Sequence, residues 1–162
     1  MYVSKRMFRT SAGMLFAATA MSCAPAPSSP DSAASKNQQV LADFANAVDS
    51  RLRQSPDYAG FHTEAGMAVF LFVRDGEASL AKATSDPRAV ARDAEFSLAQ
   101  LRAAREAVEA DFARSKVPFR LITTDYRRNR VVVDGVARGA WEAALARREI
   151  SKRPEAAYFF GN

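Results

Sequence analysis

The chain has 162 residues, of which 48% are hydrophobic, and a formal net charge of +5. Three of the positive charges, Lys5, Arg6 and Arg9, lie in the first nine residues, so the rest of the chain carries only +2. This is an ordinary surface charge and excludes the basic footprint of a nucleic-acid-binding protein. The single cysteine excludes a disulfide framework and a thiolate metal site. We expect no nucleic-acid partner and no cofactor.

The first 22 residues read as an export signal. A basic start without acidic residues is followed by an apolar run from residue 12 to residue 21. The run is too short to cross a membrane, which takes about 20 apolar residues, but it suits a secretory signal peptide. An amphipathic first helix of a cytosolic domain is the alternative, and the positive flank favours export.

The sequence Ala20-Met21-Ser22-Cys23 resembles the lipobox of bacterial lipoproteins, although Ala20 stands where leucine is usual. The resemblance implies cleavage before Cys23, a diacylglycerol on its thiol and an N-acyl chain such as palmitate. Several acyl chains anchor a protein to a membrane far more firmly than one. Ala24 replaces the aspartate that signals inner-membrane retention, which favours the outer membrane in a cell with two membranes. An ordinary cut near Ala18 or Ala20 would instead give a soluble secreted or periplasmic protein.

Residues 23–36 are rich in proline, serine and alanine, and we predict a flexible tether there. The rest, residues 37–162, is long enough to bury the core of a single domain. Apolar residues recur at helical spacing over 37–54 and predict the first helix. Strands are predicted at 58–62 and 67–73, joined as a hairpin by a turn.

The second half of the chain repeats this alternation. We expect a short helix on one or both sides of Asp86-Pro87, and residues 93–96 are a candidate strand. Ser97 and Gln100 have capping-box spacing at the start of a helix that runs to Ser115. The remaining elements are strands at 119–124 and 130–133, a helix at 138–150 and an apolar tail at 158–162. The predicted fold class is α+β: one small, mostly antiparallel sheet of four to five strands, with helices on one face, preceded by a helix and a disordered tether.

The sequence offers no catalytic and no metal-binding residues. His62 is the only histidine, and no second ligand or base stands at a usable spacing from it. No carboxylate-rich metal loop, phosphate-binding glycine pattern or nucleophile elbow is present. We therefore expect a protein that is not an enzyme, and a hydrolase of envelope material ranks last among the hypotheses.

Two groups are candidate partner-binding residues. Arg127, Arg128 and Arg130 are clustered at the second hairpin turn, and Tyr158, Phe159 and Phe160 form the apolar tail. The first group could be a solvated loop, or it could contact anionic lipid, cell-wall polymer or an acidic protein patch. The second could fold back on the core, or it could offer an apolar peptide to a partner.

Three stretches together resemble the pro-regions of secreted streptogrisin and alpha-lytic-type serine proteases, over about residues 58–136. They are Tyr58-Ala59-Gly60-Phe61, the helix entry from Glu95 to Leu101, and the hairpin from Asp125 to Val133. The resemblance implies a small sheet that packs against a protease, lowers its folding barrier and sends a C-terminal tail into its active site. No protease domain follows here, so the resemblance implies a module acting in trans, with residues 158–162 as the candidate insert.

The sequence thus predicts a lipid-anchored envelope domain that acts by protein–protein contact, as a pro-region-like inhibitor or folding helper. Its expected partners are the membrane, through the N-terminal lipid, and a secreted serine protease or an envelope protein. The alternative is a non-catalytic envelope module that binds cell-wall polymer or an assembly partner.

Overall fold

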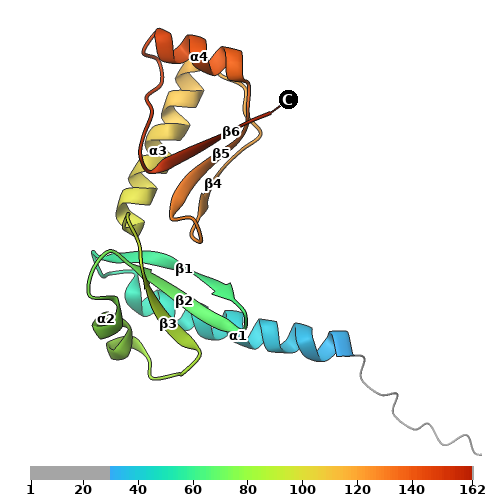
Figure 1. Cartoon of the computed structure of the whole chain (residues 1–162), viewed down its shortest axis with the longest axis vertical. Coiled ribbons are helices and arrows are strands. Elements are labelled where there is room, and N and C mark those ends of the chain that lie inside the picture. The colour runs from blue at the N-terminus through green and yellow to red at the C-terminus, as the bar shows by residue number, and fades with distance from the viewer. Residues whose placement is uncertain (1–29, 162) are drawn as a thin grey trace, which may run out of the picture.

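The computed structural model describes residues 30–161 as two consecutive units with the same order of elements (Figure 1). The predicted signal peptide, Cys23 and residues 24–29 of the predicted tether lie outside the described residues. The first unit contains α1 (Pro30–Leu52), β1 (Tyr58–Glu64), β2 (Met67–Phe72), α2 (Gly76–Ala83) and β3 (Ala89–Asp93). The second contains α3 (Leu98–Ser115), β4 (Leu121–Asp125), β5 (Arg130–Val136), α4 (Arg138–Ala146) and β6 (Ala156–Phe160).

The strands form two three-stranded sheets, so the prediction of one sheet with four to five strands is wrong. Sheet A has the order β1-β2-β3 and sheet B the order β4-β5-β6. Each sheet joins an antiparallel hairpin to a third strand that runs parallel to the middle strand. A parallel neighbour requires a crossover connection, and α2 and α4 supply one in each unit. Hydrophobic patterning places strands along the chain but does not say which strands pair.

The core of the first unit lies between α1, α2 and one face of sheet A. Leu41, Val48 and Leu52 lie on the predicted stripe of α1, and they pack against Phe70 and Phe72 of β2. The helix begins at Pro30, earlier than predicted, and so includes residues 30–36 of the predicted tether. Proline suits the first turn of a helix, because an N–H there has no partner within the helix.

The core of the second unit lies between α3, α4 and one face of sheet B. The predicted start of α3 is confirmed: the Ser97 hydroxyl accepts a hydrogen bond from Gln100 N, and the Gln100 side chain accepts one from Ser97 N. Val108 and Phe112 on the buried face of α3 belong to the same cluster as Trp141 of α4. Helices therefore cover one face of each sheet, as predicted.

Other boundaries also differ from the prediction: β1 extends to Glu64, β4 lies at Leu121–Asp125 rather than 119–124, and α4 ends at Ala146 rather than 150. The third strand lies at 89–93 rather than 93–96, because it pairs with β2 before the chain turns into α3. Gly135, with φ +67°, lets β5 continue through an irregularity in its pairing to Val136 instead of ending at 133. The tail from Ala156 to Phe160 is a strand of sheet B.

Across residues 30–161, no helix combines the length and the apolar character that crossing a membrane requires.

Candidate protein-interaction site

The turn between β4 and β5 is fixed by the side chain of Asn129. This residue is buried and adopts a left-handed conformation with φ +51°, which asparagine tolerates better than most residues. Its Oδ1 accepts hydrogen bonds from Glu95 N at 2.9 Å and Phe96 N at 2.7 Å, and its Nδ2 donates to Phe96 O at 2.8 Å. Asn129 thus ties the turn to the segment that links β3 to α3.

The same turn also contacts sheet A. The ring of Tyr126 packs against a small cluster of Ala59, Val69 and Leu71 on the sheet face opposite α1. Gly60 has φ +107°, and a Cβ there would lie 2.5 Å from Cδ1 of Tyr126. Only glycine fits this close approach, so the sequence of β1 is matched to the turn of the second unit.

The three candidate arginines have different environments. Arg130 is engaged by neighbouring side chains: its Nη2 lies 2.6 Å from Oε2 of Glu95, and its guanidinium lies over the ring of Phe96. Arg128 pairs with Asp125 and lies 5.5 Å from the ring centroid of Phe159. Arg127 is exposed and forms no ion pair with any residue from 30 to 161. Of the three, Arg127 and Arg128 remain available to a partner.

The three aromatic residues of the tail point to both sides of sheet B. Tyr158 and Phe160 belong to the helix-covered side, where their ring centroids lie 5.4 Å and 5.2 Å from that of Trp141. Phe159 lies on the opposite side and is 41% exposed. The structure therefore separates Tyr158 and Phe160 from the arginine turn and brings Phe159 next to Arg128.

The side of sheet B that bears Phe159, called here the outer face, is partly apolar. Cross-strand pairing places Leu121, Asp134 and Phe159 in one row. Leu121 is 50% exposed. Arg120 forms an ion pair with Asp134, and this hydrogen bond lowers the pKa of the Asp134 carboxyl. Figure 1 shows α3 behind the strands of sheet B, which leaves the outer face free of helices in the described part of the chain.

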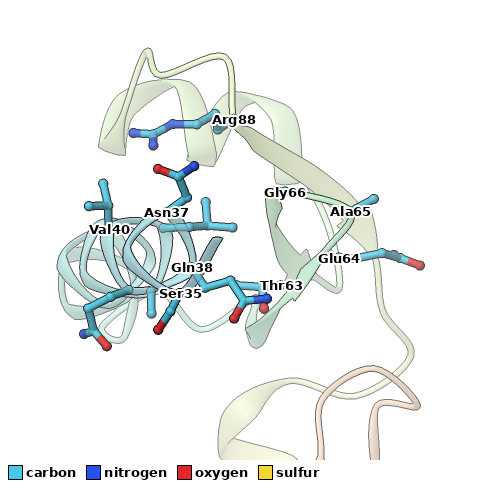
Figure 2. A pocket seen from close by; sticks show the side chains of 12 residues that line it. Ser35, Asn37, Gln38, Val40, Thr63, Glu64, Ala65, Gly66 and Arg88 are labelled. Carbon is cyan, nitrogen blue, oxygen red and sulfur yellow. The ribbon is translucent and has the colours of Figure 1, made fainter. Parts of the chain in front are cut away.

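A wide surface groove of about 860 Å³ lies beside the N-terminal half of α1. Figure 2 shows it between the helix and the turn from β1 to β2, lined mostly by small, hydroxyl and amide side chains. Its cation, Arg88, is already held by both carboxylate oxygens of Asp86. The groove therefore presents no unpaired charge that would select a ligand.

His62 lies on β1, and the described part of the chain places no catalytic arrangement around it. Its Nε2 is 3.6 Å from Oε2 of Glu64, and that same oxygen accepts a hydrogen bond from Arg92. The bond from Arg92 lowers the pKa of the Glu64 carboxyl. No cluster of three or more histidine, cysteine or acidic side chains within residues 30–161 is placed to bind a metal ion.

Sequence reasoning missed two features of this region. The Asn129 clamp joins residues 33 and 34 positions apart in the chain, which no local pattern reveals. The second is a groove between α4 and β6 that combines aromatic rings with cations. Its signal in the sequence was Trp141, the only tryptophan, three residues after Arg138.

Comparison with known proteins gives one match. The family model described as the alpha-lytic protease prodomain matches residues 96–148. This range runs from the start of α3 to just beyond α4 and includes the hairpin of sheet B with its Asn129 turn. No curated protein matches the chain. The match supports the resemblance to protease pro-regions over α3, β4, β5 and α4.

Proposed function

We propose that this protein is a pro-region-like partner of a secreted serine protease, which it inhibits or helps to fold. The single observation that carries the proposal is the family match at residues 96–148. Pro-regions of this family are not catalytic and act by contact with a protease. The proposal places the chain among proteins that act by protein–protein contact.

The outer face of sheet B is the proposed contact surface. Leu121 and Phe159 together expose apolar area, and Arg128 lies beside Phe159 at the margin. Protein interfaces commonly combine an apolar centre, often aromatic, with arginine. Insertion of Tyr158 and Phe160 into a protease cleft would require β6 to leave sheet B, because both residues pair within it or pack beneath it. We therefore favour contact through the intact sheet.

The test is the inhibition of an alpha-lytic-type serine protease by the purified chain and by Phe159→Asp. A carboxylate in an apolar contact loses its solvation without a partner, so we expect inhibition at least about tenfold weaker. Val40→Asp is the matched control, because Val40 is also an exposed apolar residue, 55% exposed, but lies on α1. Equal inhibition by wild type and Phe159→Asp would exclude this face as the contact.

We further propose that the chain is exported and anchored through lipid on Cys23. Support comes from the basic start, the short apolar run and the lipobox-like sequence before the lone cysteine. Cys23→Ser removes the only thiol. We expect the variant to leave the membrane fraction, and unchanged fractionation would contradict lipid attachment.

A further inference from the structure

The groove between α4 and β6, called here the α4–β6 groove, has an aromatic floor. It has a volume of about 480 Å³ and contains Trp141, Tyr158 and Phe160. The Trp141 and Phe160 rings meet edge to face, and the Tyr158 ring packs against Trp141 in a tilted arrangement. Burial raises the pKa of the Tyr158 hydroxyl, so this group stays neutral. The floor is therefore apolar and uncharged.

Two cationic side chains lie over the aromatic rings of this floor. The guanidinium carbon of Arg138 lies 4.0 Å from the centroid of Phe160, and Nζ of Lys152 lies 5.4 Å from that of Trp141. Glu142 is the one carboxylate in the lining; it lies 3.9 Å from Arg138, and both side chains are well exposed, so this pair is weak. Lys152 forms no ion pair with any described residue. The groove therefore has an excess of positive charge.

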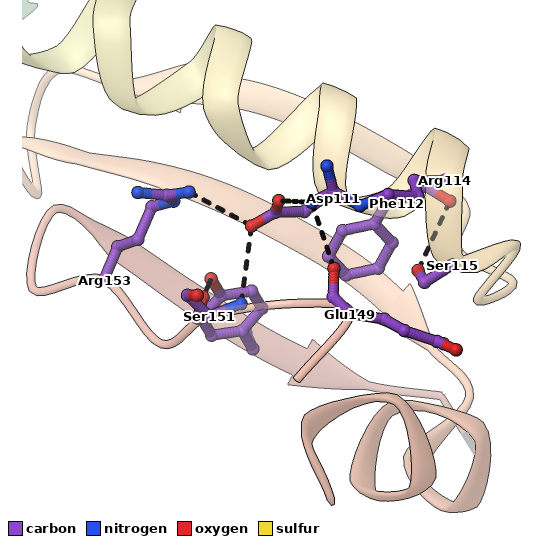
Figure 3. A network of polar contacts seen from close by, with 8 residues as sticks. Asp111, Phe112, Arg114, Ser115, Glu149, Ser151 and Arg153 are labelled. Atoms are coloured by element: carbon purple, nitrogen blue, oxygen red, sulfur yellow. Dashed lines mark hydrogen bonds and ion pairs between the residues drawn. The ribbon is translucent and has the colours of Figure 1, made fainter. Parts of the chain in front are cut away.

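The loop that carries Lys152 is held in place from α3. Figure 3 shows the buried carboxylate of Asp111 between Arg153, Arg114 and the backbone of Ser151. Its Oδ2 lies 3.1 Å from Nη2 of Arg153, and the Tyr158 hydroxyl donates to Ser151 O at 3.3 Å. This holds the backbone at Lys152 in place, and a fixed loop lowers the entropy cost of binding.

We propose that the α4–β6 groove binds an acidic peptide segment in extended conformation, with its carboxylates at Arg138 and Lys152. A peptide fits better than another anion because, among the strands of residues 30–161, β6 has a neighbour on one side only. Glu155 O and Gly161 N form hydrogen bonds to β5. Successive residues of a strand direct their backbone groups to opposite edges, and Tyr158 is three positions from both of these residues. Its N–H and C=O therefore point away from β5. These groups are free to bind peptide amides. The groove lies on the helix side of sheet B, so the proposal does not depend on the protease contact.

The test uses fluorescence anisotropy with a labelled eight-residue peptide in which glutamate alternates with threonine and valine. A peptide with lysine in place of glutamate is the ligand control. We expect the double variant Arg138→Glu/Lys152→Glu to bind the glutamate peptide at least about tenfold more weakly than wild type. Both side chains are exposed, so thermal unfolding of this variant should stay near that of wild type.

Lys82→Glu/Arg102→Glu is the charge-matched control, because both residues are exposed cations on other helices. It should bind the peptide as wild type does. An equal loss of binding in this control would show attraction by net charge alone and overturn the proposal. Binding of phosphatidylglycerol vesicles without binding of the glutamate peptide would overturn it as well. The assay contains no protease, so its result is independent of whether the chain inhibits one.

Discussion

Asn129 fixes the β4–β5 turn to the segment that links the two units. It uses both ends of its amide on the linker before α3 and adopts a backbone conformation that few residues accept. The candidate arginines on either side therefore have a fixed position. Arg130 is bound to Glu95, whereas Arg127 and Arg128 are presented outward.

Two substitutions of Asn129 separate the contribution of its side-chain hydrogen bonds from that of its left-handed backbone conformation. Asn129→Gly keeps the left-handed turn accessible but removes all three hydrogen bonds and leaves buried Phe96 N without an acceptor. We expect a loss of about 2–3 kcal/mol in the free energy of unfolding, measured in urea. Asn129→Ala should lose about 1 kcal/mol more, because alanine is strained at this φ. Wild-type stability of the glycine variant would contradict the clamp.

Asp86 contributes to the loss of folding stability at acid pH. Its side chain accepts hydrogen bonds from the side chain and backbone of Arg88, which lower the pKa of Asp86 to about 2 from 3.8. Since the folded pKa is depressed, the stabilisation is complete above about pH 4 and is lost as the pH falls toward 2. Asp86→Asn should therefore show a shallower fall in unfolding free energy between pH 4 and 2. Identical pH profiles for the two proteins would refute this assignment.

At the scale of elements, most helices and strands could be predicted from local sequence signals. The capping box at Ser97, the stripe of α1 and the apolar run of β2 each contain their own periodicity or end signal. The start of α1 escaped prediction because its first turns lack an apolar stripe. The groove escaped because Arg138, Lys152 and Tyr158 come from three separate segments, which only the crossover between β5 and β6 brings together.

The capping box can be tested against another serine of the same helix. Ser97→Ala removes the acceptor for Gln100 N and should cost about 1 kcal/mol of stability by thermal or urea unfolding. Ser115→Ala is the control variant, because the Ser115 hydroxyl makes only a 3.5 Å contact with Phe112 O at the far end of α3. Similar losses in both variants would mean that the cap contributes nothing particular.

At the scale of the whole molecule, the chain repeats one arrangement: a helix, a hairpin, a crossover helix and a parallel strand. The separation into two sheets was not predictable, because one list of strands is compatible with either one sheet or two. The units are joined by the β4–β5 turn, which contacts Gly60 in one and Phe96 between them, and by Leu98 at the start of α3, which belongs to the core cluster of the first unit. The matched pro-region range begins at this junction and leaves the first unit outside.

The most direct measurement of the proposed function is binding between the purified chain and the secreted alpha-lytic-type serine proteases of the same cell. Each protease is used with its serine nucleophile replaced by alanine, so that it cannot degrade the chain, and binding is followed by calorimetry. The account predicts saturable binding with one chain per protease. If the chain inhibits the protease, a substrate-like inhibitor should compete with it. If it assists folding, the active enzyme should recover activity when it is refolded with the chain. Absence of binding to every such protease would contradict it.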